Sequence, residues 1–193
     1  MTNLVTPVGT LSFPNLFIPK AKTPAPGAPL VYSCSILFDP EAQKTPEFKA
    51  LKQGLFDAAK LKHGADVDMK KIMATDWPIR DAAEKDYAGY EKGFVYISPW
   101  ASGEPGRSPP GIVDGRLQVV IDPSKVYAGA KIRANVSPFG WTYLTTRKGV
   151  SFGLNHIQLV DTTTPRIDGR VTVDKAFSPL ENLEETEDTD NPF

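Results

Sequence analysis

Residues 93–101 place three aromatic side chains, Phe94, Tyr96 and Trp100, at even positions, where they would share one face of a β-strand. The bases of a single-stranded nucleic acid stack on such rings, so this spacing is typical of a nucleic-acid-binding surface. The rings could equally pack under a helix or a proline-rich loop, which is the more common fate of a single aromatic residue. The choice therefore depends on the charged residues that accompany them.

Residues 126–136 alternate apolar and polar side chains with the same two-residue period. The even positions are all apolar: Val126, Ala128, Ala130, Ile132, Ala134 and Val136. The odd positions include Tyr127, Lys131 and Arg133, so the outer face of this predicted strand carries a ring and two cations. Cations pair with phosphates where rings stack on bases. We therefore expect this face and the aromatic face of residues 93–101 to form one DNA-binding site.

A third group of aromatic and basic residues follows in residues 137–148. Proline and glycine in residues 137–143 predict a loop, which carries Trp141 and Tyr143, and Arg147 and Lys148 come soon after it. The loop side chains either fold over a bound strand or pack against one another as an ordinary loop cluster. We include these four residues in the predicted DNA-binding site.

The net charge of −1 conceals an uneven distribution of charge along the chain. Six acidic residues and no basic residue follow position 180, so residues 1–180 carry 22 basic and 17 acidic side chains. This excess of positive charge indicates an anionic partner for the body, whereas residues 181–193 are predicted to form a disordered acidic tail. The tail either only solubilises the protein or binds a partner through Asp188, Asp190 and the terminal Phe193, whose ring and carboxylate would fit a pocket with a basic rim.

Groups that could support catalysis are sparse in this sequence. The histidines are His63 and His156 and the one cysteine is Cys34, so the usual ligand spacing of a zinc site is absent. The aspartates of residues 66–81 are spaced like solvated charges, and residues 102–111 lack the lysine of a phosphate-binding loop. We expect no enzymatic activity, no cofactor and no metal.

Several elements must position these side chains. Prolines in residues 3–20 predict a broken edge strand or two short strands, and residues 30–39 alternate like a half-buried strand. Thr45, Pro46 and Glu47 predict the start of a helix of about four turns that ends at His63-Gly64. Its apolar face consists of Phe48, Leu51, Leu55, Phe56 and Ala59. Residues 65–92 show no clear pattern.

The second half of the chain reads as strands. These are residues 93–101, 116–121, 126–136 and 149–160, with a turn at Asp168-Gly169 before a last strand. We therefore predict a mainly β, OB-fold-like antiparallel barrel with one amphipathic helix and long loops, as one domain over residues 1–180. No apolar run reaches the roughly 20 residues of a membrane helix, so an intracellular protein without membrane contact is expected.

Four segments in this order resemble a family of bacteriophage single-stranded-DNA-binding proteins of the Enc34 type. They are GFVYISPWASG, PPGIVDG, VIDPSKVYAGAKIRANVSPF and GVSFGLNHIQLV, and the most specific pieces are Tyr127-x-Gly129 and residues 149–155. The resemblance covers most of residues 1–175. It implies an OB-fold protein that coats single-stranded DNA without sequence preference in phage replication and recombination, in the cytoplasm of the infected bacterium. The acidic tail is similar to tails that recruit replication proteins such as a polymerase or helicase.

A different function also fits the residues. A structural or adaptor protein could use the aromatic face for protein–protein contacts, with a tail that only solubilises. The two functions differ in a simple measurement, because binding to single-stranded DNA weakens with salt at about −0.7 per phosphate contact on a log–log scale.

Overall fold

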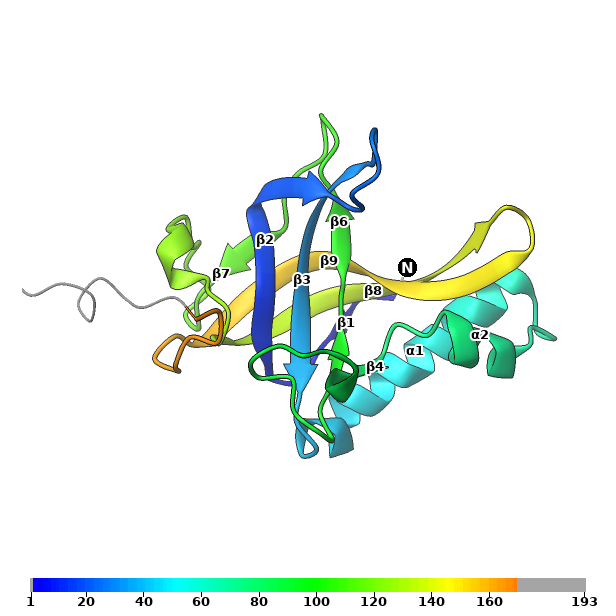
Figure 1. The fold of residues 1–193 in the computed structure, drawn as a ribbon, viewed down its shortest axis with the longest axis horizontal. Coiled ribbons are helices and arrows are strands. Elements are labelled where there is room, and N and C mark those ends of the chain that lie inside the picture. The colour runs from blue at the N-terminus through cyan, green and yellow to red at the C-terminus, as the bar shows by residue number, and fades with distance from the viewer. Residues whose placement is uncertain (1, 170–193) are drawn as a thin grey trace, which may run out of the picture.

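The computed structural model describes residues 2–169, which form nine strands and two α-helices (Figure 1). The strands are β1 (Leu4–Val5), β2 (Gly9–Ala21), β3 (Leu30–Phe38), β4 (Arg80–Asp81), β5 (Val95–Ile97), β6 (Trp100–Ser102), β7 (Gly111–Val113), β8 (Lys131–Tyr143) and β9 (Arg147–Asp161), and the helices are α1 (Pro46–His63) and α2 (Met69–Thr75). No helix in this range has the length and apolar character needed to cross a membrane. The predicted last strand and the acidic tail lie outside the described residues.

The strands form one sheet that closes on itself. Their order is β1-β8-β2-β3-β6-β9-β7, and β5 pairs with β3 and β4 beside this path. Because β8 also pairs directly with β9, the strands from β8 to β9 close into a ring. This closed, mainly β arrangement confirms the predicted fold class. Two pairings differ from the expected antiparallel pattern, because β6 and β7 each run parallel to β9.

Helix α1 packs against β8 and β9 at the lower side of the sheet in Figure 1. The Thr45 hydroxyl accepts the Phe48 N–H at 3.3 Å, which caps the first turn, and Gly64 ends the helix with a φ of 93°. The predicted helix is thus confirmed, although it is longer than four turns. The buried positions agree except at Phe56, which is half-buried against Trp77, whereas Ala58 is buried.

Strand β2 corrects the prediction of a broken edge strand. It runs continuously through Pro14 and Pro19 and lies between β8 and β3. Its register with β3 shifts twice, between Ser12 and Asn15 and again before Lys20. Bulges at these places accommodate the prolines, which cannot donate to the ladder, so the strand survives inside the sheet.

Three further segments differ from their predicted form. Residues 93–101 form two strands, β5 and β6, separated at Ser98-Pro99. Residues 137–143 are not a loop but the second half of β8, which forms with β9 a hairpin that extends beyond the closed sheet (Figure 1). Residues 116–121 make a single bridge between Val113 and Val119 rather than a strand.

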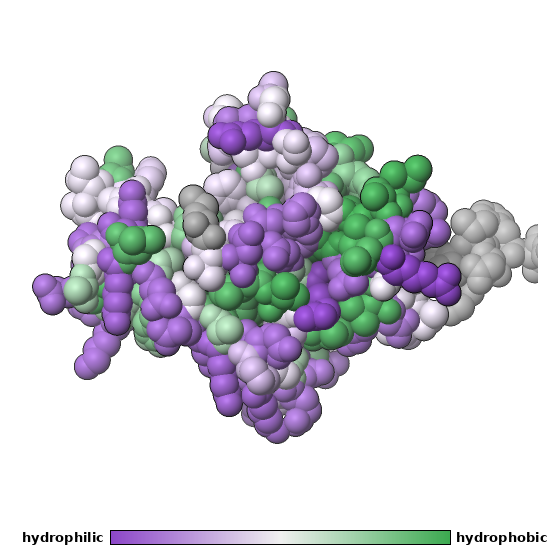
Figure 2. All heavy atoms as spheres, turned by 180° about the vertical axis from the view of Figure 1, so that it is seen from behind, coloured by the Kyte–Doolittle hydropathy of each residue, from purple (hydrophilic) through white to green (hydrophobic). Residues whose placement is uncertain are grey.

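The surface reflects this division into closed sheet and hairpin. On the face opposite to Figure 1, hydrophilic side chains predominate at the hairpin end, and hydrophobic side chains gather over the other half of the molecule (Figure 2). In the unpatterned residues 65–92, α2 is capped by Asp68, which accepts the Lys71 N–H at 3.1 Å. This helix lies beside the hairpin and brings residues 76–80 next to it.

Candidate nucleic-acid interface

A groove of about 970 Å³ lies between the β8–β9 hairpin, the β5–β6 segment and the residues after α2. Six aromatic side chains line it: Trp77, Tyr96, Trp100, Phe139, Trp141 and Tyr143. Three cations, Lys22, Arg80 and Arg147, and one carboxylate, Asp76, complete its charged lining. We call this feature the Trp100 groove. Its rings suit bases and its cations suit phosphates, as a site for a single nucleic-acid strand needs.

Strands β8 and β9 direct one row of side chains into this groove. The ladder pairs Phe139 with Ser151, Trp141 with Gly149 and Tyr143 with Arg147. Directly opposed residues in an antiparallel pair lie on the same face of the sheet. The hairpin therefore acts as one wall of the groove, with aromatic residues at positions 139, 141 and 143 of β8.

Trp100, on the neighbouring strand β6, lines the groove together with Lys22. The Lys22 Nζ lies 3.6 Å from the centre of the Trp100 ring, and the Phe139 ring meets Trp100 edge-on at 5.9 Å. Partial burial lowers the pKa of Lys22. The contact places a cation and a stacking surface within the reach of a single nucleotide.

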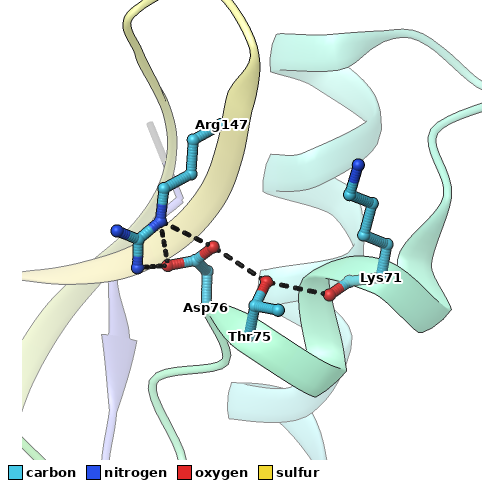
Figure 3. Close-up of polar contacts among 4 residues, drawn as sticks. All are labelled: Lys71, Thr75, Asp76 and Arg147. Carbon is cyan, nitrogen blue, oxygen red and sulfur yellow. Dashed lines mark hydrogen bonds and ion pairs between the residues drawn. The ribbon is translucent and has the colours of Figure 1, made fainter.

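Arg147 joins the hairpin to α2 through a two-pronged ion pair with Asp76 (Figure 3). Its Nη2 donates to Asp76 Oδ1 at 2.6 Å, and its Nε donates to Oδ1 at 3.0 Å and Oδ2 at 3.1 Å. The Thr75 hydroxyl donates to Oδ2 at 2.9 Å. These hydrogen bonds, that of Arg147 above all, hold the pKa of the buried Asp76 carboxyl below its usual value. The pair holds the end of α2 against the hairpin.

The structure brings about half of the predicted site residues into the Trp100 groove. Those that line it are Tyr96, Trp100, Trp141, Tyr143 and Arg147. Lys148 lines a neighbouring cleft between α2 and the hairpin, which it shares with Arg147.

Phe94 and Tyr127 lie outside the groove. Phe94 packs against a small buried cluster formed by Leu37, Ala82, Tyr90 and Tyr96. Tyr127 is buried, and its hydroxyl donates to the Thr164 carbonyl at 2.7 Å. Residues outside the predicted strands contact both rings, which alternation within one strand cannot reveal.

Lys131 and Arg133 also lie outside the groove, although the alternation that singled them out is correct. The even positions of the segment are buried and these two side chains are partly exposed. The Lys131 Nζ donates to Thr10 Oγ1 at 2.8 Å, and the Arg133 Nε donates to the Thr6 carbonyl at 3.5 Å. Both therefore face the β1–β2 region instead of the aromatic walls.

The predicted site did not include Lys22, Trp77 and Arg80, and it left out Phe139 although that ring belongs to the predicted aromatic loop. Lys22 stands at the start of a proline-rich loop and Arg80 follows Trp77-Pro78-Ile79, an apolar group in a polar segment. The isolated apolar group at residues 77–79 was the one sign in the sequence that this segment packs against the rest of the protein. Within residues 2–169, no three histidine, cysteine, aspartate or glutamate side chains come together as metal ligands would.

Comparison with known families decides the kind of protein that carries this groove. The model of a family described as the single-stranded-DNA-binding protein of Enterobacter phage Enc34 matches residues 2–191. The chain belongs to this family. The family is one of single-stranded-DNA-binding proteins and not of enzymes, so the resemblance and the expected lack of catalysis are both confirmed.

Solved structures of similar fold include two phage proteins. The single-stranded-DNA-binding protein of bacteriophage Enc34, in complex with ssDNA, has a TM-score of 0.66 and 16% identity, covering 84% of this chain and 88% of its own. The protein gp2.5 of bacteriophage T7, a single-stranded-DNA-binding protein, has a TM-score of 0.64 and 13% identity, covering 89% and 98%. At these identities the likeness shows a shared fold. No curated protein matches the chain.

Proposed function

We propose that the chain binds single-stranded DNA along the Trp100 groove without reading its base sequence. The observation that carries this proposal is the gathering of six rings and three cations in one groove of a chain from this family. Stacking accepts any base because every base has a π-face, and phosphate pairing is equally independent of sequence. We also propose that this binding coats single-stranded DNA during phage replication and recombination, in the cytoplasm of the infected bacterium.

Substitution of the groove rings tests the proposal. Trp100→Ala and Trp141→Ala are each expected to weaken oligo-dT binding by about 1 to 3 kcal/mol, the usual value of one base stack. Mixed-sequence oligomers should lose the same amount. Leu144→Ala is a matched control, because Leu144 is exposed on the same hairpin and does not line the groove.

Fluorescence anisotropy at several salt concentrations gives the affinities, and thermal unfolding shows whether each variant folds. Unimpaired binding by both tryptophan variants would place the DNA elsewhere on the protein. A wild-type protein that binds no oligo-dT at low salt would instead support the structural or adaptor function.

We further propose that residues 181–193 recruit a replication protein, such as a polymerase or helicase. The proposal rests on charge, because the acidic tail is attached to a body with five excess positive charges and ends in an aromatic ring. The tethered acids would compete weakly for the groove until DNA displaces them and frees Asp188, Asp190 and Phe193 for the partner.

Two shortened proteins separate the parts of this mechanism. Truncation after Leu180 is expected to tighten DNA binding and abolish capture of a purified phage polymerase or helicase. Deletion of Phe193 alone should abolish capture and leave DNA affinity unchanged, since only the acids compete with phosphate. A truncated protein that still captures the partner would refute the role of the tail.

A further inference from the structure

A second cleft of about 970 Å³ lies beside residues 87 and 88, which contribute to its lining. Its lining comes from β2, from the loops before β5 and β8 and from the last described residues, and it includes Phe13, Lys20, Tyr87, Tyr127, Arg166 and Asp168. We call it the Phe13 cleft. None of its lining residues lines the Trp100 groove.

Two half-exposed aromatic rings meet in this cleft. Phe13 is 50% exposed and Tyr87 is 54% exposed, and their ring centres lie 5.1 Å apart in an edge-on contact. Exposed rings of this size leave apolar surface in contact with water. Burial of that surface against a ligand would be favourable. The pair therefore offers exposed ring surface against which a base could stack.

The backbone at Phe13 is held in an uncommon conformation. Its φ is +47°, in the left-handed region that a phenylalanine rarely adopts. The residue lies at the bulge between Ser12 and Asn15, and the Asn15 side chain donates to the Phe13 carbonyl at 3.3 Å. Strain of this kind persists where the surrounding structure maintains it, and it is frequent at binding sites.

Cations accompany these rings. Lys20 is exposed and makes no ion pair within residues 2–169. The Arg166 guanidinium lies 4.9 Å from the centre of the Tyr127 ring and is paired with Asp168 at 2.7 Å. Lys20 is thus available to a phosphate, and Arg166 supplies a second cation whose charge Asp168 partly offsets.

A row of ring contacts connects the cleft to the groove. Tyr96 lines the Trp100 groove and meets Tyr90 at 5.5 Å, and Tyr90 meets Tyr87 at 5.6 Å and Phe13 at 6.4 Å. Tyr90 and Tyr96 are buried, and Tyr90 lines neither site, so this inner part of the row supports the outer rings. Groove and cleft are therefore two ends of one aromatic cluster.

We propose that the Phe13 cleft is a second base-stacking site for single-stranded DNA, which takes nucleotides of the strand that has filled the Trp100 groove. Phe13 and Tyr87 stack on bases, and Lys20 pairs with a phosphate. The proposal rests on the proposed function, because the groove determines which strand reaches the cleft. It deepens that function by assigning a longer binding path than the groove alone provides.

A length series of oligo-dT tests the second site. Phe13→Ala and Tyr87→Ala are expected to bind short oligomers like the wild type and to lose about 5- to 100-fold in affinity once the oligomer is long enough to reach the cleft. Trp100→Ala should lose affinity at every length. Ile18→Ala is the matched control, because Ile18 is an exposed apolar residue of β2 that lines neither site.

The outcomes separate the two sites. Wild-type affinity of Tyr87→Ala at all lengths would refute the second site, as would an equal loss at all lengths. If Phe13→Ala fails to fold, Tyr87→Ala and Lys20→Gln carry the test, and Lys20→Gln should flatten the salt dependence for long oligomers only. A Trp100→Ala protein that binds every length normally would refute the groove, and with it the path from groove to cleft.

Discussion

The indole of Trp141 lies against Gly149, its partner across the β8–β9 ladder. A Cβ on residue 149 would overlap the atoms of the ring, so the ring rests on the sheet only because residue 149 has no side chain. The Arg147 guanidinium carbon lies 5.9 Å from the centre of the same ring. Gly149 therefore determines where one wall of the Trp100 groove stands.

Gly149→Ala should displace Trp141 and weaken DNA binding by up to one base stack, about 1 to 3 kcal/mol. The backbone at Gly149 does not have a positive φ, so an alanine is compatible with the strand itself. Oligo-dT titration measures the loss. Gly115→Ala is the control, because its Cβ would have ordinary contact only with the Leu159 carbonyl oxygen, at 3.9 Å. Equal affinities of the two variants would contradict the role of Gly149.

Replacing Lys22 and Arg80 with glutamine should reduce the steepness of the salt dependence by about 0.7 for each phosphate that no longer has a cationic partner. Both cations line the groove, and Lys22 also contacts the Trp100 ring. The matched control replaces Lys131 and Arg133, which have the same charges and lie outside the groove. The opposite result, in which only the Lys131 and Arg133 variant shows a reduced salt dependence, would place the phosphates on the β8 face predicted from the sequence.

Asp76→Asn should alter the pH dependence of stability. The Arg147 hydrogen bonds lower the pKa of Asp76 in the folded protein below its ordinary value of 3.8. The ion pair therefore stabilises the fold fully above the unfolded pKa, and this contribution is lost as the pH falls through the folded pKa. Urea unfolding should show a constant difference between wild type and variant at neutral pH, which shrinks below about pH 4. A difference that persists unchanged into strong acid would rule out this origin.

Cys34 should resist thiol reagents until the protein unfolds. The residue is buried in the main core, and burial raises the pKa of its thiol to about 12. The reactive thiolate is therefore scarce at about pH 8, and reagent cannot reach the sulfur. Absorbance with an aromatic disulfide reagent, followed through a urea titration, should rise together with the unfolding transition. Rapid reaction of the native protein would show that β3 opens locally.

The sequence predicted those elements whose signals lie within a few residues of one another. Thr45, Pro46 and Gly64 mark both ends of α1, and the apolar period places its buried face. The alternation of residues 130–136 likewise predicts which side chains of β8 point inward. These signals are local because helical and strand periods repeat over short distances.

Residues 137–143 show why other elements escaped prediction. Pro138 and Gly140 are typical of a loop, yet they pair with Phe152 and Val150 because β9 supplies partners along the whole length of β8. The partner strand, and not the local sequence, makes this segment extended. The break between β5 and β6 at Ser98-Pro99 could not be predicted either, because the alternation of side chains continues across it.

By itself, the amino-acid sequence determined a mainly β chain with one strong helix, a basic body, an acidic end and enough aromatic residues for a base-stacking surface. Tertiary structure alone decided which rings meet. Trp100 reaches Phe139 because β6 and β8 flank β9, whereas residues outside their own segments pack against Phe94 and Tyr127. The physical reason is that alternation determines the face on which a side chain lies, but the exposure of that face depends on which distant segment packs over it.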